Sequence, residues 1–268
     1  MFVALTFVTH EGIKISNEFS AVNLLFLPFL QNLSWPMVAA WYHESWSLAV
    51  EEWFYLLFPL LFVIFSGSVN RRVLKVALTL AVVPLLLRAL WFDPAVNWDE
   101  NVRKVVVIRL DAIAYGILAV WFSRQFPEQC RNYRGTILFS GITGICISTL
   151  MYVGALHVSA WVMHTVLFSL VSASFALIVL ASRNFDFSPG VVPAQCINWL
   201  STRSYALYLC HGTIIKSMIF AGIFANTFAY AVAVFSVSCF VLAEVSHRLI
   251  ELPFMRMRPE PLRRPVAA

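Results

Sequence analysis

The chain has 268 residues, of which 60% are hydrophobic and only 12% are charged, and its mean hydropathy is +0.78. Soluble domains carry about 25% charged residues, so a chain this apolar could not cover a water-exposed surface with polar groups. The composition therefore predicts an integral membrane protein. The formal net charge of +5 is modest, and the absence of a dense basic run or a binding motif excludes nucleic acid as an expected partner.

The first residues, "MFVALTFVT", form an apolar run of about nine residues, which is too short to cross a bilayer and lacks the basic start of a signal peptide. We interpret this run as the end of a truncated helix. The stretch "AVNLLFLPFLQNL" is also short and contains Pro28, so we expect an interfacial or re-entrant segment there.

Seven later segments are apolar over about the 20 residues that a helix needs to cross the hydrocarbon core. They are approximately 46–65, 73–92, 105–122, 136–155, 161–180, 199–223 and 228–247. The predicted fold class is therefore all-α: a polytopic integral membrane helical bundle with about seven full spans. We expect one helical domain over residues 1–255, incomplete at its N-terminus, and a basic cytoplasmic tail over 256–268.

The loops between the spans predict the orientation of the chain. The loops "SGSVNRR" and "SRQFPEQCRNYRG" and the tail are basic, whereas "HVSA" and "FANT" contain no Lys or Arg. Basic loops stay in the cytoplasm. We therefore expect a multi-pass membrane protein with its C-terminus in the cytoplasm.

Ionisable side chains lie inside several predicted spans, roughly 6–10 Å below their outer ends at 1.5 Å per helical residue. A charge at mid-membrane costs about 2.5–3.5 kcal/mol on insertion scales, so such residues usually pair with one another or line a functional cavity. The alternative is that buried ion pairs only hold helices together. The residues are Glu51, Glu52, Arg88, Arg109, Asp111 and Lys216.

Helical geometry limits which of these charges can meet. Glu51 and Glu52 differ by about 100° around their helix, and Arg109 and Asp111 differ by about 200°, so each needs a partner on another helix. We predict that Arg109 pairs with Glu51 or Glu52. Tyr55 lies within reach of either glutamate.

A second group of polar residues lies in "SYALYLCHGTIIK". Tyr208 and His211 share one helical face with Ser204, which predicts a polar lining for a substrate cavity. The alternative is that His211 is a hydrogen-bonded core residue. Nearer the C-terminus, His247 and Glu251 form an i, i+4 pair, for which we expect a membrane-anchoring role.

Several of these stretches resemble motifs of the membrane acyltransferase-3 family, the O-acetylases of bacterial surface sugars. "SWSLAVEEWFYLLFPLL" resembles the family signature, "IRLDAIAYGILAVWF" its Arg-containing span, "SYALYLCH" its Tyr–His helix and "IELPFMRMR" its closing Glu-Pro segment. The matches follow the family order from about Trp46 to Arg258.

The resemblance implies that an acyl group, usually acetyl, passes from cytoplasmic acyl-CoA (acetyl-CoA) to a hydroxyl of an extracytoplasmic polysaccharide or lipid-linked glycan. Acyl-CoA would be a co-substrate, with no bound cofactor and no metal. The family has about ten spans. The catalytic candidates are Glu51, Glu52, Arg109 and His211, and the substrate-binding candidates are Tyr55, Arg88, Asp111, Tyr208 and Lys216.

The chain departs from the family in one important respect. The family carries an Arg and a His, its proposed catalytic base, on the first helix, and an Arg-x-x-Arg entry to the third, and neither has a counterpart here. A misplaced gene start, a degraded gene, an inactive fragment and a true short form stay open. The rival function is a polytopic transporter or proton-coupled carrier, which also places charges at mid-membrane.

Overall fold

The computed structural model describes residues 21–37, 44–183 and 190–257, and these ranges contain helices and turns without a strand. The chain divides into two compact units, Phe19–Phe187 and Ser188–Ala268 with Met1–Glu18. The residues of "MFVALTFVT" and of the tail after Met257 lie outside the described residues.

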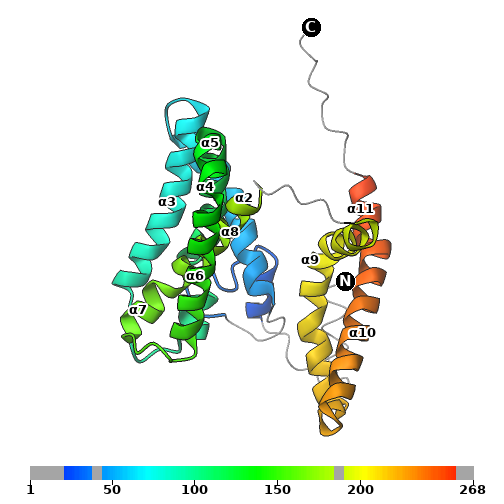
Figure 1. Cartoon of the computed structure of the whole chain (residues 1–268). Helices are drawn as coiled ribbons and strands as arrows, with labels where there is room; N and C mark the ends of the chain where they lie inside the picture. The colour runs from blue at the N-terminus through cyan, green and yellow to red at the C-terminus, as the bar shows by residue number, and fades with distance from the viewer. Residues whose placement is uncertain (1–20, 38–43, 184–189, 258–268) are drawn as a thin grey trace. The chain divides into compact units, whose positions relative to one another are not determined.

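The larger unit (blue to green in Figure 1) is a bundle of long helices joined by short helical pieces. Within it α3 packs on α4, and α8 packs on both α4 and α6. Its helices are η1 (Ala21–Phe26), α2 (Ser45–Ile64), α3 (Val69–Leu90), η2 (Asp99–Arg103), η3 (Val106–Ile108), α4 (Asp111–Gln125), α5 (Pro127–Asn132), α6 (Arg134–Tyr152), α7 (Ala160–Thr165) and α8 (Leu167–Ser182).

Small side chains allow these helices to approach closely, as is usual for helix pairs in membranes. Ala49 of α2 and Ala114 of α4 are completely buried in one apolar cluster, in which Val76 of α3 also lies. Between α6 and α8, a Cβ atom added to Gly141 would lie only 2.9 Å from the backbone oxygen of Ser174.

The segment that begins with η1 and continues to Asn32 is too short to span the unit, and it packs against α2 and the residues just before and within η3. The backbone oxygen of Asn32 accepts a hydrogen bond from Val106 N at 2.9 Å, and its Nδ2 donates to the oxygen of Lys104 at 2.5 Å. Trp53 Nε1 donates to the oxygen of Phe29 at 2.9 Å. Irregular backbone is tolerated at membrane depth when protein satisfies its polar groups, so this short non-spanning segment fits the predicted interfacial or re-entrant piece.

The smaller unit contains α9 and α10, which run side by side in Figure 1. Cys210, Ile214 and Met218 of α9 form its apolar core with Ala231 and Cys239 of α10. Its elements are α9 (Val191–Phe220), η4 (Ile223–Ala225), α10 (Phe228–Ser246), η5 (His247–Glu251) and α11 (Leu252–Arg256).

Each predicted span is mainly helical, so the all-α membrane fold is confirmed, but the count of seven full spans is not. Among the described residues, five helical segments are long and apolar enough to cross a membrane: Ser45–Ile64, Val69–Leu90, Val106–Gln125, Arg134–Tyr152 and Phe228–Arg256. The fifth predicted span, 161–180, is divided at Val166 into α7 and the 16-residue α8.

Candidate functional site

The centre of the larger unit holds an ion pair between Arg88, in the last turn of α3, and Asp111, the first residue of α4. Arg88 Nη2 lies 2.7 Å from Asp111 Oδ2, and both side chains have zero solvent exposure. Its Nη1 also donates to Asp111 Oδ1 at 3.2 Å. The expectation that Asp111 needs a partner from another helix is confirmed.

Groups from three further elements, η3, α7 and α8, complete the hydrogen bonds of this pair. Arg88 Nε donates to the oxygen of Thr165 at 3.0 Å, and its Nη1 donates to the oxygen of Ile108. Its Nη2 donates to Ser169 Oγ at 2.5 Å, and Ser169 Oγ donates to Asp111 Oδ2 at 2.7 Å. A buried polar network that is fully satisfied is rigid. Arg88 and Asp111 are therefore enclosed, and this geometry favours a positioning role over direct substrate contact.

Arg109 lies two residues before Asp111 and has a different environment. Its guanidinium carbon is 4.2 Å from the ring centroid of Phe168 on α8, a cation–π contact. Its Nε and Nη1 are buried and have no hydrogen-bond partner in the described part of the chain. A buried cation with unpaired donors is costly, so Arg109 is ready to accept an anionic or strongly polar partner.

Arg109 lines a cavity of about 680 Å³. Cavities of about 300–1,000 Å³ hold small-molecule ligands. Aromatic rings and aliphatic side chains supply most of the wall, and hydroxyls and two arginines supply polar groups. The lining residues are Trp46, Trp98, Asp99, Arg103, Arg109, Ile145, Ser148, Thr149, Tyr152, Leu167, Phe168, Val171 and Phe175.

The short helix η2 brings a charged cluster to the same cavity. Asp99 lies 2.7 Å from Lys104 Nζ and also pairs with Arg103; Glu100 lies 2.5 Å from Lys104 Nζ. Burial alone would raise the pKa of the Asp99 carboxyl, but hydrogen bonds from Arg103 and Lys104, with their positive charges, outweigh this and hold the pKa below its ordinary value. Asp99 is thus neutralised by its own neighbours.

The predicted ion pair between Arg109 and Glu51 or Glu52 is wrong. Among the described residues no ion pair joins them. Both glutamates are exposed on α2, as is Tyr55, whereas Arg109 lies between Phe168 and the cavity. The physical reason is that α2 packs through the face with Ala49, Val50 and Phe54, which leaves both glutamates exposed and without an ion pair.

His211, Tyr208 and Lys216 belong to α9 in the smaller unit. The oxygen of Tyr208 is hydrogen bonded to His211 Nδ1, and the two rings are 5.4 Å apart. A carbonyl oxygen can only accept, so His211 Nδ1 carries a hydrogen and a neutral imidazole presents Nε2 as a base. Lys216 is exposed.

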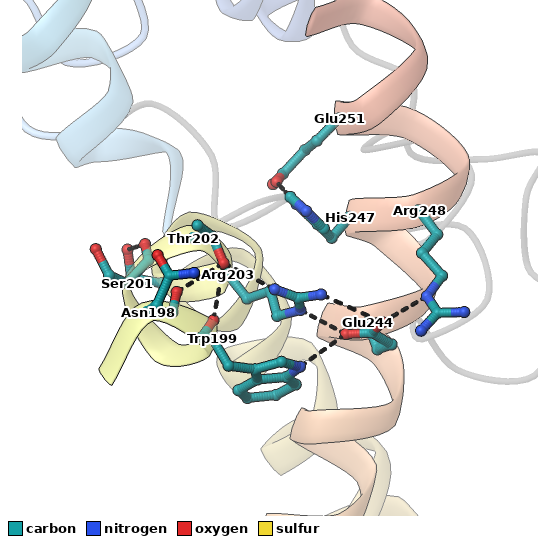
Figure 2. A network of polar contacts seen from close by, with 10 residues as sticks. Asn198, Trp199, Ser201, Thr202, Arg203, Glu244, His247, Arg248 and Glu251 are labelled. Atoms are coloured by element: carbon teal, nitrogen blue, oxygen red, sulfur yellow. Dashed lines mark hydrogen bonds and ion pairs between the residues drawn. The ribbon is translucent and has the colours of Figure 1, made fainter. Parts of the chain in front are cut away.

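A second polar network joins α9 to α10 (Figure 2). Glu244 accepts from Trp199 Nε1 at 3.0 Å, forms an ion pair with Arg203 and another with Arg248 at 2.5 Å. In Figure 2, His247 points to Glu251 one turn away, with Nδ1 2.6 Å from Oε2. This network holds two helices together near their ends.

Sequence reasoning missed Ser169, Phe168 and Lys104. Ser169 and Phe168 lie in an apolar run, "LFSLVSASF", where the only signal was a small polar residue of the kind that hydrogen bonds between membrane helices. Lys104 closes the mixed loop "DPAVNWDENVRK", whose acids four and five residues earlier are its partners.

These features define a class: a helical membrane protein whose cavity, lined by cations and aromatic rings, lies beside a buried ion pair. A family model described as an acyltransferase domain matches residues 1–243. The chain belongs to the acyltransferase-3 family.

Three curated relatives show how far the likeness extends. Peptidoglycan O-acetyltransferase OatA of Listeria monocytogenes is 25% identical over 223 residues, which cover 79% of this chain and 35% of the relative. The putative peptidoglycan O-acetyltransferase YrhL of Bacillus subtilis is 25% identical over 78% of this chain and 34% of its own length. O-acetyltransferase OatA of Staphylococcus aureus is 24% identical over 79% of this chain and 36% of its own.

The chain thus spans about a third of the length of the curated relatives it matches. No solved structure matches the chain.

Proposed function

We propose that this chain is a membrane O-acetyltransferase domain that moves an acetyl group onto a hydroxyl of an extracytoplasmic saccharide. Peptidoglycan, the substrate in the names of two relatives, is the proposed acceptor. The observation that supports this most is Arg109, a buried cation with two unpaired donor nitrogens beside a cavity of about 680 Å³.

The chemistry of acyl transfer asks for such a residue. When a hydroxyl attacks an acyl carbon, negative charge develops on the carbonyl oxygen, and donors held in a water-poor site stabilise it more than water does. Phe168 fixes the plane of the Arg109 guanidinium at 4.2 Å. We propose that Arg109 stabilises this oxygen, while aromatic rings such as Trp46 and Trp98 enclose the substrate.

A base must take the proton of the attacking hydroxyl. We propose Glu51 or Glu52, which are exposed on α2, for this step or for orienting the acceptor. His211, whose Nδ1 is hydrogen bonded to the oxygen of Tyr208, is proposed separately as a catalytic candidate of the smaller unit. Tyr55 and Tyr208 are the proposed acceptor-binding hydroxyls.

We further propose acyl-CoA as the donor, reaching the site from the cytoplasmic side, where the C-terminus would also lie. Lys216, which is exposed on α9 toward the outer end of its predicted span, is proposed as an acceptor contact of the smaller unit. Radioactive acetyl transferred from acetyl-CoA to glycan by inside-out vesicles, but not by right-side-out vesicles, is the expected result for a cytoplasmic donor.

The test of the function compares glycans from cells that express the chain, Arg109→Ala or Lys75→Gln. Lys75 is the control because it is an exposed cation of α3 outside the cavity. Mass spectrometry of muropeptides should show added acetyl groups with the wild type and the control, and a loss of about 10²–10³-fold with Arg109→Ala.

Glycans that gain no acetyl group from the wild-type chain, despite normal membrane levels, would contradict the proposal. The same cells would then be assayed for solute uptake, because a carrier moves its substrate without covalent change.

A further inference from the structure

We infer that Arg88 is a positioning residue that keeps Arg109 aligned and unpaired in the cavity wall. The inference rests on the proposed function, in which the free Arg109 guanidinium meets a negatively charged oxygen. It assigns to the buried Arg88–Asp111 pair a task beyond holding helices together.

The first argument concerns the two neighbours of Arg109. Arg88 Nη1 donates to the oxygen of Ile108, the residue just before Arg109, and this fixes the peptide from which Arg109 leaves the backbone. Arg88 Nη2 donates to Ser169 Oγ at 2.5 Å, the residue just after Phe168. One guanidinium therefore fixes both the start of the Arg109 side chain and the ring on which it lies.

The second argument concerns charge. Asp111 lies two residues from Arg109, and α4 begins only at Asp111, so the helical angle that would separate the two side chains does not apply. Arg88 and Ser169 occupy both carboxylate oxygens of Asp111, at 3.2 Å on Oδ1 and 2.7 Å on Oδ2. Because Asp111 already pairs with Arg88 and Ser169, it does not form an ion pair with Arg109, and the Arg109 guanidinium can pair with a ligand.

All the donors of Arg88 are used in this arrangement. Nε bonds to Thr165, Nη1 to Ile108 and Asp111, and Nη2 to Asp111 and Ser169. Arginine has five N–H donors in a fixed fork and lysine has three on a flexible stem. The inference therefore predicts that Lys cannot replace Arg88.

The first test uses two serines of α8. Ser169 bonds to both members of the ion pair, whereas Ser174, also buried, only donates to the oxygen of Leu170 in its own helix at 2.6 Å. Ser169→Ala should lower kcat for acetyl transfer about tenfold with KM for the glycan unchanged, because a hydrogen bond to charged groups is lost. Ser174→Ala should change neither, and Ser169→Thr should restore kcat.

The second test does not depend on activity. Phenylglyoxal labelling of Arg109, followed by peptide mass spectrometry, reports whether its guanidinium is free. Arg88→Met should slow labelling several-fold, because the released Asp111 captures Arg109, and Arg88→Met with Asp111→Leu should restore the wild-type rate. Membrane levels of each variant are measured in parallel, and if Arg88→Met is absent from the membrane the serine comparison decides.

The inference is overturned if Ser169→Ala has the same kcat as Ser174→Ala while Arg109→Ala abolishes transfer. It is also overturned if Arg109 is labelled at the same rate in the wild type, in Arg88→Met and in Arg88→Met with Asp111→Leu. Failure of the proposed function gives a different pattern. The wild type then transfers no acetyl group, and the labelling rates alone support or overturn the role of Arg88.

Discussion

Arg88 and Asp111, separated by 23 residues, join α3 to α4 by an ion pair of 2.7 Å from which solvent is excluded. Ser169 adds α8 to the same contact. Replacing both members of a buried pair with apolar residues is often harmless, but removing one leaves an unpaired charge in a low-dielectric interior. Removing either Arg88 or Asp111 alone should therefore destabilise the protein more than removing both.

Asp111→Ala should lower the free energy of unfolding by about 3–5 kcal/mol, because it leaves the Arg88 guanidinium buried without its counter-ion. Unfolding of the detergent-solubilised protein measures this loss. Glu128→Ala, at an exposed position of α5, is the control and should change the free energy by no more than about 0.5 kcal/mol. An Asp111→Ala protein as stable as the control would contradict the structural account.

Gly141 allows α6 and α8 to pack closely. A Cβ atom there would lie 2.7 Å from Ile178 Cγ1 and 2.9 Å from the backbone oxygen of Ser174, and the backbone cannot move without separating the helices. Gly141→Ala should therefore destabilise the protein by about 1–3 kcal/mol. Gly116→Ala is the matched control, because no atom lies within 4 Å of its added Cβ.

In the control, alanine favours the helix by about 0.5–1 kcal/mol over glycine. The two substitutions should thus shift the unfolding midpoint in opposite directions. Equal shifts would mean that the α6–α8 contact is looser than the structure shows.

The sequence was sufficient to predict the helices because twenty-residue apolar runs leave the backbone few alternatives in a membrane. It was not sufficient to predict whether each apolar run forms one continuous helix. The run over 161–180 reads as one span, yet it breaks at Val166 between α7 and α8. Hydrophobic periodicity does not reveal this break, because the group that stabilises it is distant in the sequence. The carbonyl oxygen of Thr165 accepts a hydrogen bond from Arg88, 77 residues away.

The sequence predicted that buried charges pair between helices, but it did not predict which residues pair. A buried Arg and a buried Asp predict partners on other helices, and Asp111 has one in Arg88. Which cation meets which anion depends on helix rotation, and α2 is rotated so that Glu51 and Glu52 are exposed, while Arg109 lies against the Phe168 ring. No spacing rule within one helix can supply this angle between helices.

Arg203 and Arg248 both bind Glu244, but they should contribute unequally (Figure 2). The Arg203 side chain is 15% exposed and lies 4.9 Å from the Trp199 ring, whereas the Arg248 side chain is 70% exposed. Exposed ion pairs contribute about 0–1 kcal/mol. Arg203→Gln should therefore lower the unfolding midpoint clearly and Arg248→Gln only slightly. The reverse order would show that the α9–α10 contact does not depend on the buried arginine.

The pairing of Asp99 with Lys104 should make the stability of the cavity wall depend on pH. Hydrogen bonds and charges hold the Asp99 pKa below its ordinary value of 3.8, so its contribution is present above that value and is lost as the pH falls through the lowered pKa. Unfolding midpoints of the wild type and Asp99→Asn should differ at neutral pH and converge in strong acid. A difference of the same size at neutral pH and in strong acid would contradict this origin.

Glu51 and Glu52 provide the sharpest test of the proposed acid–base step. Both are exposed, so replacing either with Gln should leave the unfolding free energy within about 0.5 kcal/mol. The side chains point about 100° apart, so only one can face the reacting hydroxyl. The Gln variant at that position should lose about 10²–10⁴-fold in acetyl transfer, measured on muropeptides, while the other retains activity. If both retain full activity, neither carboxylate takes the proton.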